Sequence, residues 1–438
     1  MAQSTAMVSA VPASKEAMTL KDNNKNGGPL SHLRVLDLTQ FLSGPYATQI
    51  LGDLGAEIIK VEAPDGDMTR RLPPHFVGSE SAYYLSVNRN KRSMVIDMKS
   101  EPGRALVRDL ALACDIVVEN FRPGILKRLG LSYEDISAQK PGIIWCCISG
   151  FGQDGPYRDR PAYDMIVQAM SGSMSLTGEP DGPPVRSGIP IGDLAAGMYG
   201  VIGILAAVAE RDQNGRGKSI DVGMLDCQVA MLSYQAAYYL TSGHVPSRQG
   251  RGHDSIPSYR AFTCSDGVDV AITANTERMF VNLCKAIGHS ELPDDERFRT
   301  NEKRYANRIA LWKILEDAFR AKSAQAWMDA LVAAEVPAAV VNTLDHSLSD
   351  PQVLHRKMVL ELNGPGGEKL RVAGNPIKFS GDSEPHYSYP PTLGADNRSV
   401  LSHLLGLTDE RIDALAQEGA FGAPSQTLAE KEKVSGRG

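Results

Sequence analysis

The stretch RVLDLTQFLSGPYATQILGDLGAEIIKVE, residues 34–62, decides the fold of this chain. It opens with an apolar run over residues 34–39, which is typical of a buried strand. A turn with Pro45 follows, and proline suits the first turn of a helix, here expected over residues 46–54. Residues 56–62 form the next apolar strand. The pattern predicts a βαβ unit and therefore a parallel sheet with right-handed crossovers.

The residues that follow repeat this alternation of strand and helix. Apolar runs predict strands over residues 93–98, 115–119 and 142–149, with a helix over residues 102–113. The chain is therefore expected to be of the α/β class, with an open, parallel, Rossmann-like sheet in a large domain. Ligands of such sheets bind beyond the carboxyl ends of the strands. The loops that meet this description are residues 40–45, 120–124 and 150–156.

A smaller α+β domain is expected after the large one. Its predicted elements are helices over residues 225–240, 276–287, 301–320 and 323–334, and a strand over residues 268–273. A Gly-Pro-Gly-Gly turn at 364–367 predicts a later hairpin. The predicted boundaries are a disordered tail at 1–28, the first part of the large domain at 29–224, the small domain at 225–343, a return to the large domain at 344–424 and a disordered tail at 425–438.

Composition excludes several classes of partner. Of the 438 residues, 42% are hydrophobic and 22% are charged, which is ordinary for a soluble globular protein. The net charge of −6 favours neither nucleic acid nor an anionic membrane. The uncharged apolar run at residues 194–209 is shorter than the ~20 residues of a membrane span. We expect a cytoplasmic protein.

The cysteines and histidines show no spacing typical of a metal site, since Cys-x-x-Cys and His-Glu-x-x-His are both absent. We therefore expect buried free thiols in a reducing compartment and no bound metal. The cysteines are Cys114, Cys146, Cys147, Cys227, Cys264 and Cys284.

One carboxylate stands out by its surroundings. The stretch PIGDLAAGM, residues 190–198, places Asp193 between two glycines at the start of a long apolar helix. Aspartate is a preferred N-cap, and the helix dipole favours its ionised form. Gly192 leaves room for another molecule to approach the backbone. On these residues alone, Asp193 is either a helix cap or a reactive carboxylate.

Many short motifs, all in one order, resemble the class III CoA-transferases, a family that includes formyl-CoA transferase and carnitine CoA-transferase. The motifs are RVLDLT (34–39), SGP (43–45), GDLGAEIIKVE (52–62), NRNKR (88–92), VENFRPG (118–124), GFG (150–152), TG (177–178), GD (192–193) and NGRG (214–217). The resemblance covers about residues 33–405. It implies an interlocked homodimer that binds no permanent cofactor and uses coenzyme A or acyl-CoA as substrate.

The resemblance also implies roles for individual residues. Asp193 becomes the nucleophile, which forms a mixed anhydride and then an aspartyl-CoA thioester. Backbone N–H groups near Gly192 are expected to stabilise the oxyanion. The implied CoA contacts are Leu42, Ser43, Ile96, Asp97, Met98, Lys99, Asn120, Phe121, Arg122, Arg128, Tyr163 and Asp164.

The chain departs from the family pattern at two basic positions. An expected arginine is replaced by Ala63, for which Arg70 or Arg71 is a candidate substitute. An expected lysine is replaced by Pro161. The four-glycine lid of formyl-CoA transferase is also absent, and residues 250–253 are expected to occupy its place. This last departure argues against formyl-CoA as substrate.

The stretches FVGSESAYYLSVNRNKR (76–92), GHDSI (252–256) and PQVLH (351–355) resemble the branch of the family that acts on succinyl-CoA and glutarate. The resemblance implies succinyl-CoA as donor and a dicarboxylic acid such as glutarate, hydroxymethylglutarate or itaconate as acceptor. A distal carboxylate needs a cationic or donor-rich partner, because an unpaired buried charge is costly. The candidate substrate residues are Arg186, Arg251, Gly252 and His253.

Three other functions are considered. A 2-methylacyl-CoA racemase of the same fold needs a histidine–aspartate pair, but the matching motif reads Ala162-Tyr163-Asp164, and tyrosine is a poor base at neutral pH. A non-catalytic CoA-binding protein would not need Asp193. A nicotinamide-dependent dehydrogenase would carry Gly-x-Gly-x-x-Gly in the first loop, and that motif is absent.

Overall fold

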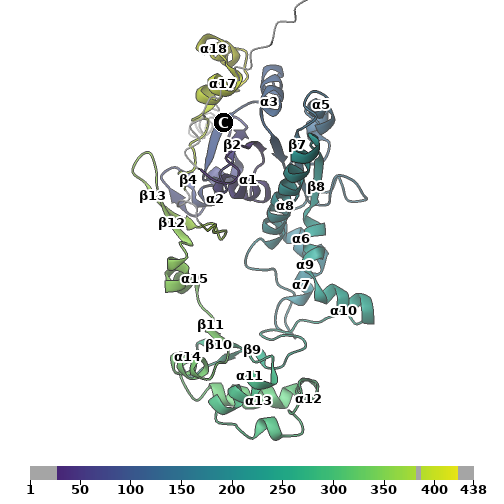
Figure 1. Ribbon diagram of the computed structural model, residues 1–438, viewed down its shortest axis with the longest axis vertical. Helices are drawn as coiled ribbons and strands as arrows, with labels where there is room; N and C mark the ends of the chain where they lie inside the picture. The colour runs from purple at the N-terminus through teal and green to yellow at the C-terminus, as the bar shows by residue number, and fades with distance from the viewer. Residues whose placement is uncertain (1–26, 381–385, 423–438) are drawn as a thin grey trace, which may run out of the picture.

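The computed structural model describes residues 27–380 and 386–422 (Figure 1). The predicted tails therefore lie outside the described residues, except for Gly27 and Gly28. The Gly28 carbonyl accepts a hydrogen bond of 3.1 Å from the Ser31 N–H, so Gly28 belongs to the folded part although the predicted boundary placed it in the tail.

The core of the upper part is a parallel sheet, as predicted, and it has six strands. Its strands are β1 (Arg34–Leu38), β2 (Glu57–Glu62), β5 (Lys91–Val95), β6 (Ile116–Glu119), β7 (Ile144–Ser149) and β8 (Ser219–Gly223), of which β8 was not predicted. They lie in the order β5-β2-β1-β6-β7-β8. The chain moves outward from β1 through β2 to β5 and then returns to β6 on the other side of β1. This reversal between β1 and β6 is where ligands of open α/β sheets bind.

Two apolar clusters cover the two faces of the sheet. On one face α1 (Ser43–Asp53) packs on α8 (Ile191–Asn214), together with residues of α6 (Asp164–Ser171) and α9 (Met224–Met231). On the other face lie α3 (Glu101–Ala113), α5 (Tyr133–Ser137), α17 (Asn397–Leu405) and α18 (Asp409–Gln417). A Cβ on Gly197 would lie 2.7 Å from the Ser43 carbonyl oxygen. Glycine therefore permits the close approach of α8 to α1.

The last helices return to the edge of the sheet beside β5. The Asn397 side chain accepts a hydrogen bond from the Val95 N–H at 2.8 Å and donates one to the Val95 carbonyl at 3.0 Å. The Asp396 carboxylate accepts from the Ser93 N–H at 2.9 Å. These contacts satisfy backbone N–H and C=O groups at the edge of β5 that would otherwise pair with a neighbouring strand.

The lower part of Figure 1 has its own sheet and core. Strands β9 (Tyr259–Thr263), β10 (Asp269–Thr273) and β11 (Ala338–Val340) form an antiparallel sheet in the order β11-β10-β9. It is covered by α11 (Glu277–Ala286), η2 (Leu292–Asp294), α12 (Asn301–Ala306), α13 (Arg308–Phe319) and α14 (Ala324–Ala333). Phe262, Phe319 and Trp327 stack at its centre.

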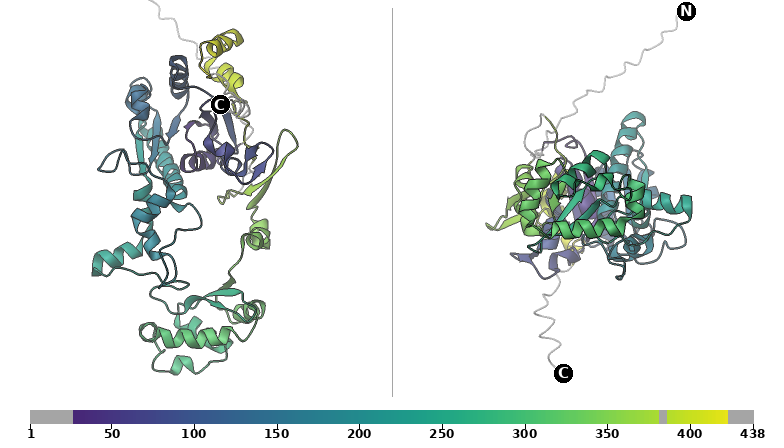
Figure 2. Two further views of the ribbon diagram at one scale, coloured as in Figure 1. Left: turned by 180° about the vertical axis from the view of Figure 1, so that it is seen from behind. Right: turned by 90° about the horizontal axis from the view of Figure 1, so that it is seen from below.

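Two separate connections join the upper and lower parts (Figures 1 and 2). One descends past α10 (Tyr234–Ser242), and the other climbs through α15 (Leu344–Ser349) and α16 (Pro351–His355) to the predicted hairpin, β12 (Val359–Asn363) and β13 (Lys369–Ala373). The remaining short elements are η1 (Met68–Arg71), β3 (Phe76–Val77), β4 (Glu80–Ser81), α2 (Ala82–Ser86), α4 (Ile125–Arg128) and α7 (Ser173–Leu176).

Several predicted boundaries are wrong. The helix predicted over 225–240 is two helices, α9 and α10, because Ser233 adopts a φ of 51°. The helix predicted over 301–320 is also two, α12 and α13, and Asn307 interrupts it with a φ of −107°. The strand predicted over 93–98 is β5, which begins and ends earlier. The six cysteines are buried and free, as predicted.

Helix α8 is longer than the uncharged apolar run at residues 194–209 from which it was predicted. By length and composition it is able to cross a membrane, with a mean hydropathy of 1.8 over an 18-residue window. Half of that window is buried inside the protein, where α8 contacts α1, β7 and β8. In this fold α8 is the central helix of one face of the sheet.

Candidate active site

Asp193 lies at the carboxyl edge of the sheet, beside the reversal between β1 and β6. It is half-buried and faces a cavity of about 270 Å³. The loops after β1, β6 and β7, which are the three loops predicted to lie beyond the carboxyl ends of strands, line this cavity together. The lining residues are Gln40, Phe41, Ser43, Asn120, Phe121, Arg122, Pro123, Ile125, Ile148, Ser149, Gly150, Arg158, Arg160, Pro161, Ala162, Tyr163, Asp193 and Met224.

Helix α8 begins three residues before its predicted start, so Asp193 is not its N-cap. Pro190 is the N-cap residue and makes no side-chain cap bond. Asp164, from α6, supplies the cap instead: its Oδ1 accepts a hydrogen bond of 2.8 Å from the Gly192 N–H. The Gly192 N–H is therefore not available to an oxyanion, and the expected role of the neighbouring N–H groups stays a prediction. The Asp193 side chain is therefore not used to cap the helix.

Gly192 has a steric role beside Asp164. A Cβ built on Gly192 would lie 3.1 Å from the Asp164 Oδ1. Any larger residue would push on the carboxylate that caps the helix. The glycine before Asp193 is thus explained by the contact between α6 and α8.

The pKa of Asp193 is raised to about 7. Burial is the largest cause, and the negative charge of Asp164 adds to it; a hydrogen bond from the Ser43 side chain opposes both. Burial and a like charge each disfavour the ionised form. Asp193 is therefore a carboxylic acid that titrates near neutral pH, which is typical of functional sites.

The loops around the cavity are tied to one another. The Gln40 N–H donates to the Asn120 Oδ1 at 3.0 Å, and the Asn120 Nδ2 donates to the Gln40 carbonyl at 2.8 Å. Phe41, which has a φ of 64°, meets Tyr163 edge to face at 5.9 Å between ring centroids. The loops after β1 and β6 and the start of α6 thus form one rigid wall of the cavity.

Arginines surround the open side of the cavity. Two of them converge on Gly124: a Cβ there would lie 3.2 Å from the Arg158 Nη2 and 3.7 Å from the Arg128 Nη1. Among the described residues, Arg122, Arg128 and Arg160 have no carboxylate partner, and Arg160 instead lies 3.9 Å above the Tyr157 ring. Arg158 pairs with Asp159 at 3.2 Å. The guanidinium groups that have no carboxylate partner suit an anion such as phosphate.

Arg158 and Arg160 were missed by the sequence analysis. They lie just before Pro161, the position where the family pattern has lysine, and this proximity was the one available signal. Arg70, predicted as a substitute for the arginine missing at Ala63, does not reach the cavity. It is buried and bonded to Glu62 at 2.7 Å and Glu80 at 2.9 Å, so that substitution is wrong.

The predicted substrate residues differ in how available their side chains are. Arg251 is engaged by Asp269 at 2.9 Å and lies 4.0 Å from Glu179. Gly252 forms a β-bridge with Arg260. The exposed side chain of Arg186 donates to the carbonyl of Ser187 at 3.0 Å, and no carboxylate among the described residues pairs with it. Arg186 is thus the predicted cation best able to accept a new carboxylate.

His253 is held between aromatic rings. Its ring stacks on Tyr234 at 5.7 Å and on Tyr259 at 5.4 Å between centroids. Its Nδ1 accepts a hydrogen bond of 3.2 Å from the Ser255 N–H. The other ring nitrogen, Nε2, lies 3.4 Å from the Tyr234 hydroxyl. The ring is fixed by its neighbours, and none of these contacts involves the cavity beside Asp193.

Residues 30–397 match the model of the family described as CoA-transferase family III. The chain belongs to CoA-transferase family III. It is 41% identical over 392 residues to succinyl-CoA:glutarate CoA-transferase from Homo sapiens, and the match covers 89% of each chain. It is 39% identical to succinate–glutarate CoA-transferase from Agrobacterium fabrum, over 86% of this chain and 96% of that one.

A solved structure supports the same assignment. A CAIB/BAIF family protein from Brucella suis superposes with a TM-score of 0.78 at 38% identity, and the match covers 86% of this chain and 99% of that chain. The protein is accordingly an enzyme of the CoA-transferase class.

Within this family III enzyme, the predicted CoA contacts fall into two groups. Ser43, Asn120, Phe121, Arg122 and Tyr163 line the cavity together with Asp193. The others do not line it: they are Leu42, Ile96, Asp97, Met98, Lys99, Arg128 and Asp164. The side chain of Ile96 is fully buried in the core, so it does not contact a ligand directly.

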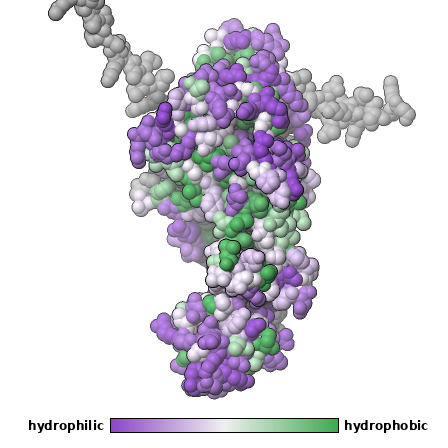
Figure 3. All heavy atoms as spheres, turned by 90° about the vertical axis from the view of Figure 1, so that its right-hand side faces the viewer, coloured by the Kyte–Doolittle hydropathy of each residue, from purple (hydrophilic) through white to green (hydrophobic). Residues whose placement is uncertain are grey.

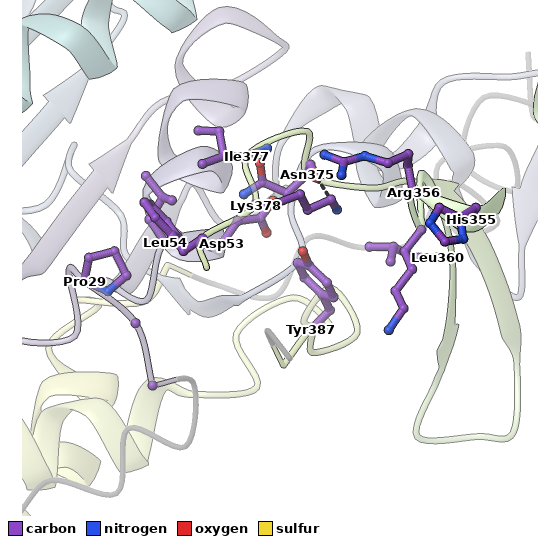
Figure 4. Close-up of a pocket in the computed structure, with 14 residues that line it drawn as sticks. Pro29, Asp53, Leu54, His355, Arg356, Leu360, Asn375, Ile377, Lys378 and Tyr387 are labelled. Carbon is purple, nitrogen blue, oxygen red and sulfur yellow. Dashed lines mark hydrogen bonds between the residues drawn. The ribbon is translucent and has the colours of Figure 1, made fainter. Parts of the chain in front are cut away.

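A larger cavity, of about 740 Å³, lies elsewhere in the CoA-transferase (Figure 4). Basic side chains of His355, Arg356 and Lys378 border it, opposite Asp53 and Tyr387. Asp53 is paired with Arg89 at 2.6 Å. None of the predicted site residues lines this cavity. Size alone does not make it the active site, because Asp193 and five of the predicted CoA contacts line the smaller cavity.

The described residues include no group of three or more His, Cys, Asp or Glu side chains able to hold a metal ion. The chemistry available to this site is that of one carboxylate and its surrounding hydrogen-bond donors.

Proposed function

We propose that the protein transfers CoA from succinyl-CoA to a dicarboxylic acid such as glutarate, with Asp193 as the nucleophile. The observation that carries this proposal is a half-buried carboxyl group of pKa about 7 that faces an arginine-rimmed cavity at the carboxyl edge of the sheet. The names of the human and Agrobacterium relatives support both substrates.

The reaction proceeds by covalent catalysis at Asp193. The carboxylate attacks the thioester carbonyl, a C–O bond forms, the C–S bond breaks, and CoA leaves as thiolate. The thiolate then attacks the aspartyl carbonyl, which releases succinate and leaves an aspartyl-CoA thioester. The acceptor carboxylate attacks this thioester to give a second anhydride and free thiolate. The thiolate takes the acceptor's acyl group and regenerates Asp193.

We propose that the arginine rim binds the phosphates of CoA. Arg122 and Arg128 are the contacts implied by the family resemblance, and Arg158 and Arg160 supply the positive charge missing at Pro161. The approach of Arg128 and Arg158 to Gly124 supports this, because guanidinium groups gathered at one place favour the binding of a phosphate.

Arg186 is proposed to bind the distal carboxylate of the acceptor. It lies in the loop that leads into α8, seven positions before Asp193. Its guanidinium is exposed and has no carboxylate partner among the described residues. Bidentate pairing with a carboxylate would favour dicarboxylic over monocarboxylic acids.

We also propose that a second copy of the chain covers an apolar surface of the monomer. Figure 3 shows hydrophobic residues gathered over the middle of the face that carries α8 and α10. Exposed apolar residues gathered on one face are typical of a protein–protein interface. The exposed residues on α6, α8, α9 and α10 are Met165, Ile166, Met170, Met198, Tyr199, Ile202, Leu205, Val229, Met231, Tyr234, Tyr238, Tyr239 and Leu240. Light scattering at micromolar concentration tests this, and a monomeric mass would contradict it.

The proposed transfer is tested with Asp193→Ala. This variant should lose transfer from succinyl-CoA to glutarate while it still binds CoA. Trapping with hydroxylamine during turnover should modify Asp193 in the wild-type enzyme, as read by peptide mass spectrometry. Glu210→Gln is the matched control, since Glu210 lies on the same helix and pairs with Lys218 far from the cavity. Near-full turnover in Asp193→Ala would refute the mechanism.

The racemase alternative is disfavoured by the geometry. Asp164, which would serve as its acid–base group, is buried and bonded to Gly192 and Gln168. Incubation of a 2-methylacyl-CoA in deuterium oxide separates the two functions, because a transferase should not exchange the α-proton.

A further inference from the structure

Gln168 is a buried glutamine whose side chain is bonded at both ends. It lies in α6 and is 1% exposed. Its Nε2 donates a hydrogen bond of 2.7 Å to the Asp164 Oδ2, one helical turn earlier. Its Oε1 accepts a hydrogen bond of 2.8 Å from the Ser187 N–H. No mechanism derived so far uses this residue.

These bonds form part of a longer chain. Asp164 uses its other oxygen, Oδ1, to accept the Gly192 N–H at 2.8 Å. The backbone at Ser187 and the backbone at Gly192 are therefore tied to one face of α6 through two side chains. Within residues 187–192, all of which the structure describes, these are the two hydrogen bonds to another element.

The segment held in this way is otherwise poorly supported. Most residues between Pro183 and Ile189 are exposed, with Val185 at 42% and Ile189 at 56%. A loop with few buried contacts is expected to move unless specific hydrogen bonds hold it. The chain of bonds through Gln168 fixes the loop at the point where it approaches the active site.

The two hydrogen bonds to α6 are made by the backbone of Ser187 and of Gly192. The two residues that the acceptor must reach lie immediately outside this segment. Arg186 immediately precedes Ser187, and Asp193 immediately follows Gly192. One end of a dicarboxylic acid would pair with Arg186 while the other attacks the aspartyl-CoA thioester. Because Asp164 and Gln168 lie on one helix, the distance between the backbone of Ser187 and the backbone of Gly192 is fixed.

We infer that Gln168 is a positioning residue that sets the acceptor length the enzyme prefers, by holding the Arg186 loop at a fixed distance from Asp193. This inference rests on the proposed function, since it requires a dicarboxylic acceptor. Gln168 itself contacts neither substrate. It acts through the backbone of Ser187 and through the Asp164 carboxylate.

The test compares Gln168→Asn, Gln168→Leu and the matched control Ser171→Ala. Asparagine keeps the buried amide but is one methylene too short to span both partners, and leucine keeps the volume without hydrogen bonds. Ser171 lies on the same helix, is also buried, and bonds to the Gln168 carbonyl at 3.1 Å. Its replacement removes a hydrogen bond without touching the ties to Ser187 and Gly192.

Two readouts are taken. The first is kcat/KM with succinyl-CoA as donor and isotope-labelled succinate, glutarate, adipate or butyrate as acceptor; the label is needed because unlabelled succinate would give back the donor. Gln168→Asn should lower the value for glutarate by about tenfold or more, because a misplacement of about 1 Å costs on the order of 100-fold. The value for butyrate, which has no distal carboxylate, should fall less than about threefold, and the dissociation constant of free CoA should stay within about twofold. Ser171→Ala should keep the wild-type order of acceptors.

The second readout is hydrogen–deuterium exchange of the peptides that contain residues 184–193. Exchange at Ser187 should rise in both Gln168 variants and stay unchanged in Ser171→Ala. Equal losses for glutarate and butyrate, or an unchanged acceptor order, would overturn the inference while leaving the proposed function intact. Unchanged exchange at Ser187 would overturn the positioning role directly. A wild-type enzyme that transfers CoA to none of the acids would refute the proposed function and the inference together.

Discussion

Replacing Asp193 with asparagine should stabilise the protein at alkaline pH while abolishing transfer. Asparagine preserves the shape of the side chain but has no charge to bury next to Asp164. The wild-type carboxyl has a pKa of about 7 in the folded protein against an ordinary value of 3.8. Between these two pH values the folded state holds a proton that the unfolded chain has already released.

The sign of the effect follows from proton linkage. Between about pH 4 and pH 7 the folded state binds more protons than the unfolded state, so the wild-type protein loses stability as pH rises. The full gap from 3.8 to about 7 corresponds to at most about 4 kcal/mol at about 1.4 kcal/mol per pH unit. Because Asp193 is only half-buried, solvent reduces this, and we expect roughly 2 kcal/mol above pH 8.

The assay is the difference in melting temperature between Asp193→Asn and wild type, measured from pH 5 to pH 8.5. The two proteins should melt within about a degree of each other at pH 5, and the variant should melt a few degrees higher at pH 8.5. Glu210→Gln serves as the control, and its difference from wild type should be flat above pH 6. A difference in melting temperature between Asp193→Asn and wild type that does not grow with pH would refute the raised pKa of Asp193.

Other consequences concern the arginine rim, the buried charges and the helix start. Substituting alanine for both Arg158 and Arg160 should raise the dissociation constant of CoA at least about tenfold and make it less dependent on salt, as titration calorimetry at two ionic strengths would show. Asp37→Asn should cost about 3–5 kcal/mol in urea unfolding, because it leaves the Lys91 ammonium, 3.0 Å away, buried and unpaired. The pKa of Asp37 is lowered to about 2, so its contribution is present above pH 4 and is lost only as pH falls toward 2. Gly192→Ala should reduce kcat about tenfold without a comparable loss in melting temperature, because the new Cβ presses on the Asp164 Oδ1.

The strands of the sheet could be predicted from the sequence because each is a short, continuous apolar run. Residues buried on both faces leave no alternation, and such runs are typical of parallel sheets. The order of the strands was not predictable in the same way, since it depends on which side of β1 the chain returns to. That order places the site, because it puts the loops after β1 and β6 next to each other.

The start of α8 could not be predicted locally. Its cap comes from Asp164, 28 residues earlier in the chain, so the local rule that aspartate caps its own helix, one of the two interpretations of Asp193, does not apply here. Arg70 was misjudged for a related reason: its partners Glu62, Glu80 and Tyr84 are brought together only by the tertiary fold. The partners of a charged residue are known only from the three-dimensional structure, because its position in the sequence gives little indication of them.

Asp164 has two opposed effects on the nucleophile. By capping the Gly192 N–H it fixes the first turn of α8 and with it the direction of the Asp193 side chain. Its charge also raises the pKa of Asp193, so at neutral pH only about half of the enzyme carries the reactive carboxylate. A more basic carboxylate is a better nucleophile once ionised, and catalytic groups work best when their pKa lies near the working pH. The kcat/KM of the wild-type enzyme should therefore rise with pH around an apparent pKa near 7. Asp164→Asn, which keeps an acceptor oxygen for Gly192 but removes the charge, should shift this midpoint to lower pH. A midpoint that stays at pH 7 in Asp164→Asn would mean that burial alone sets the acidity of the nucleophile.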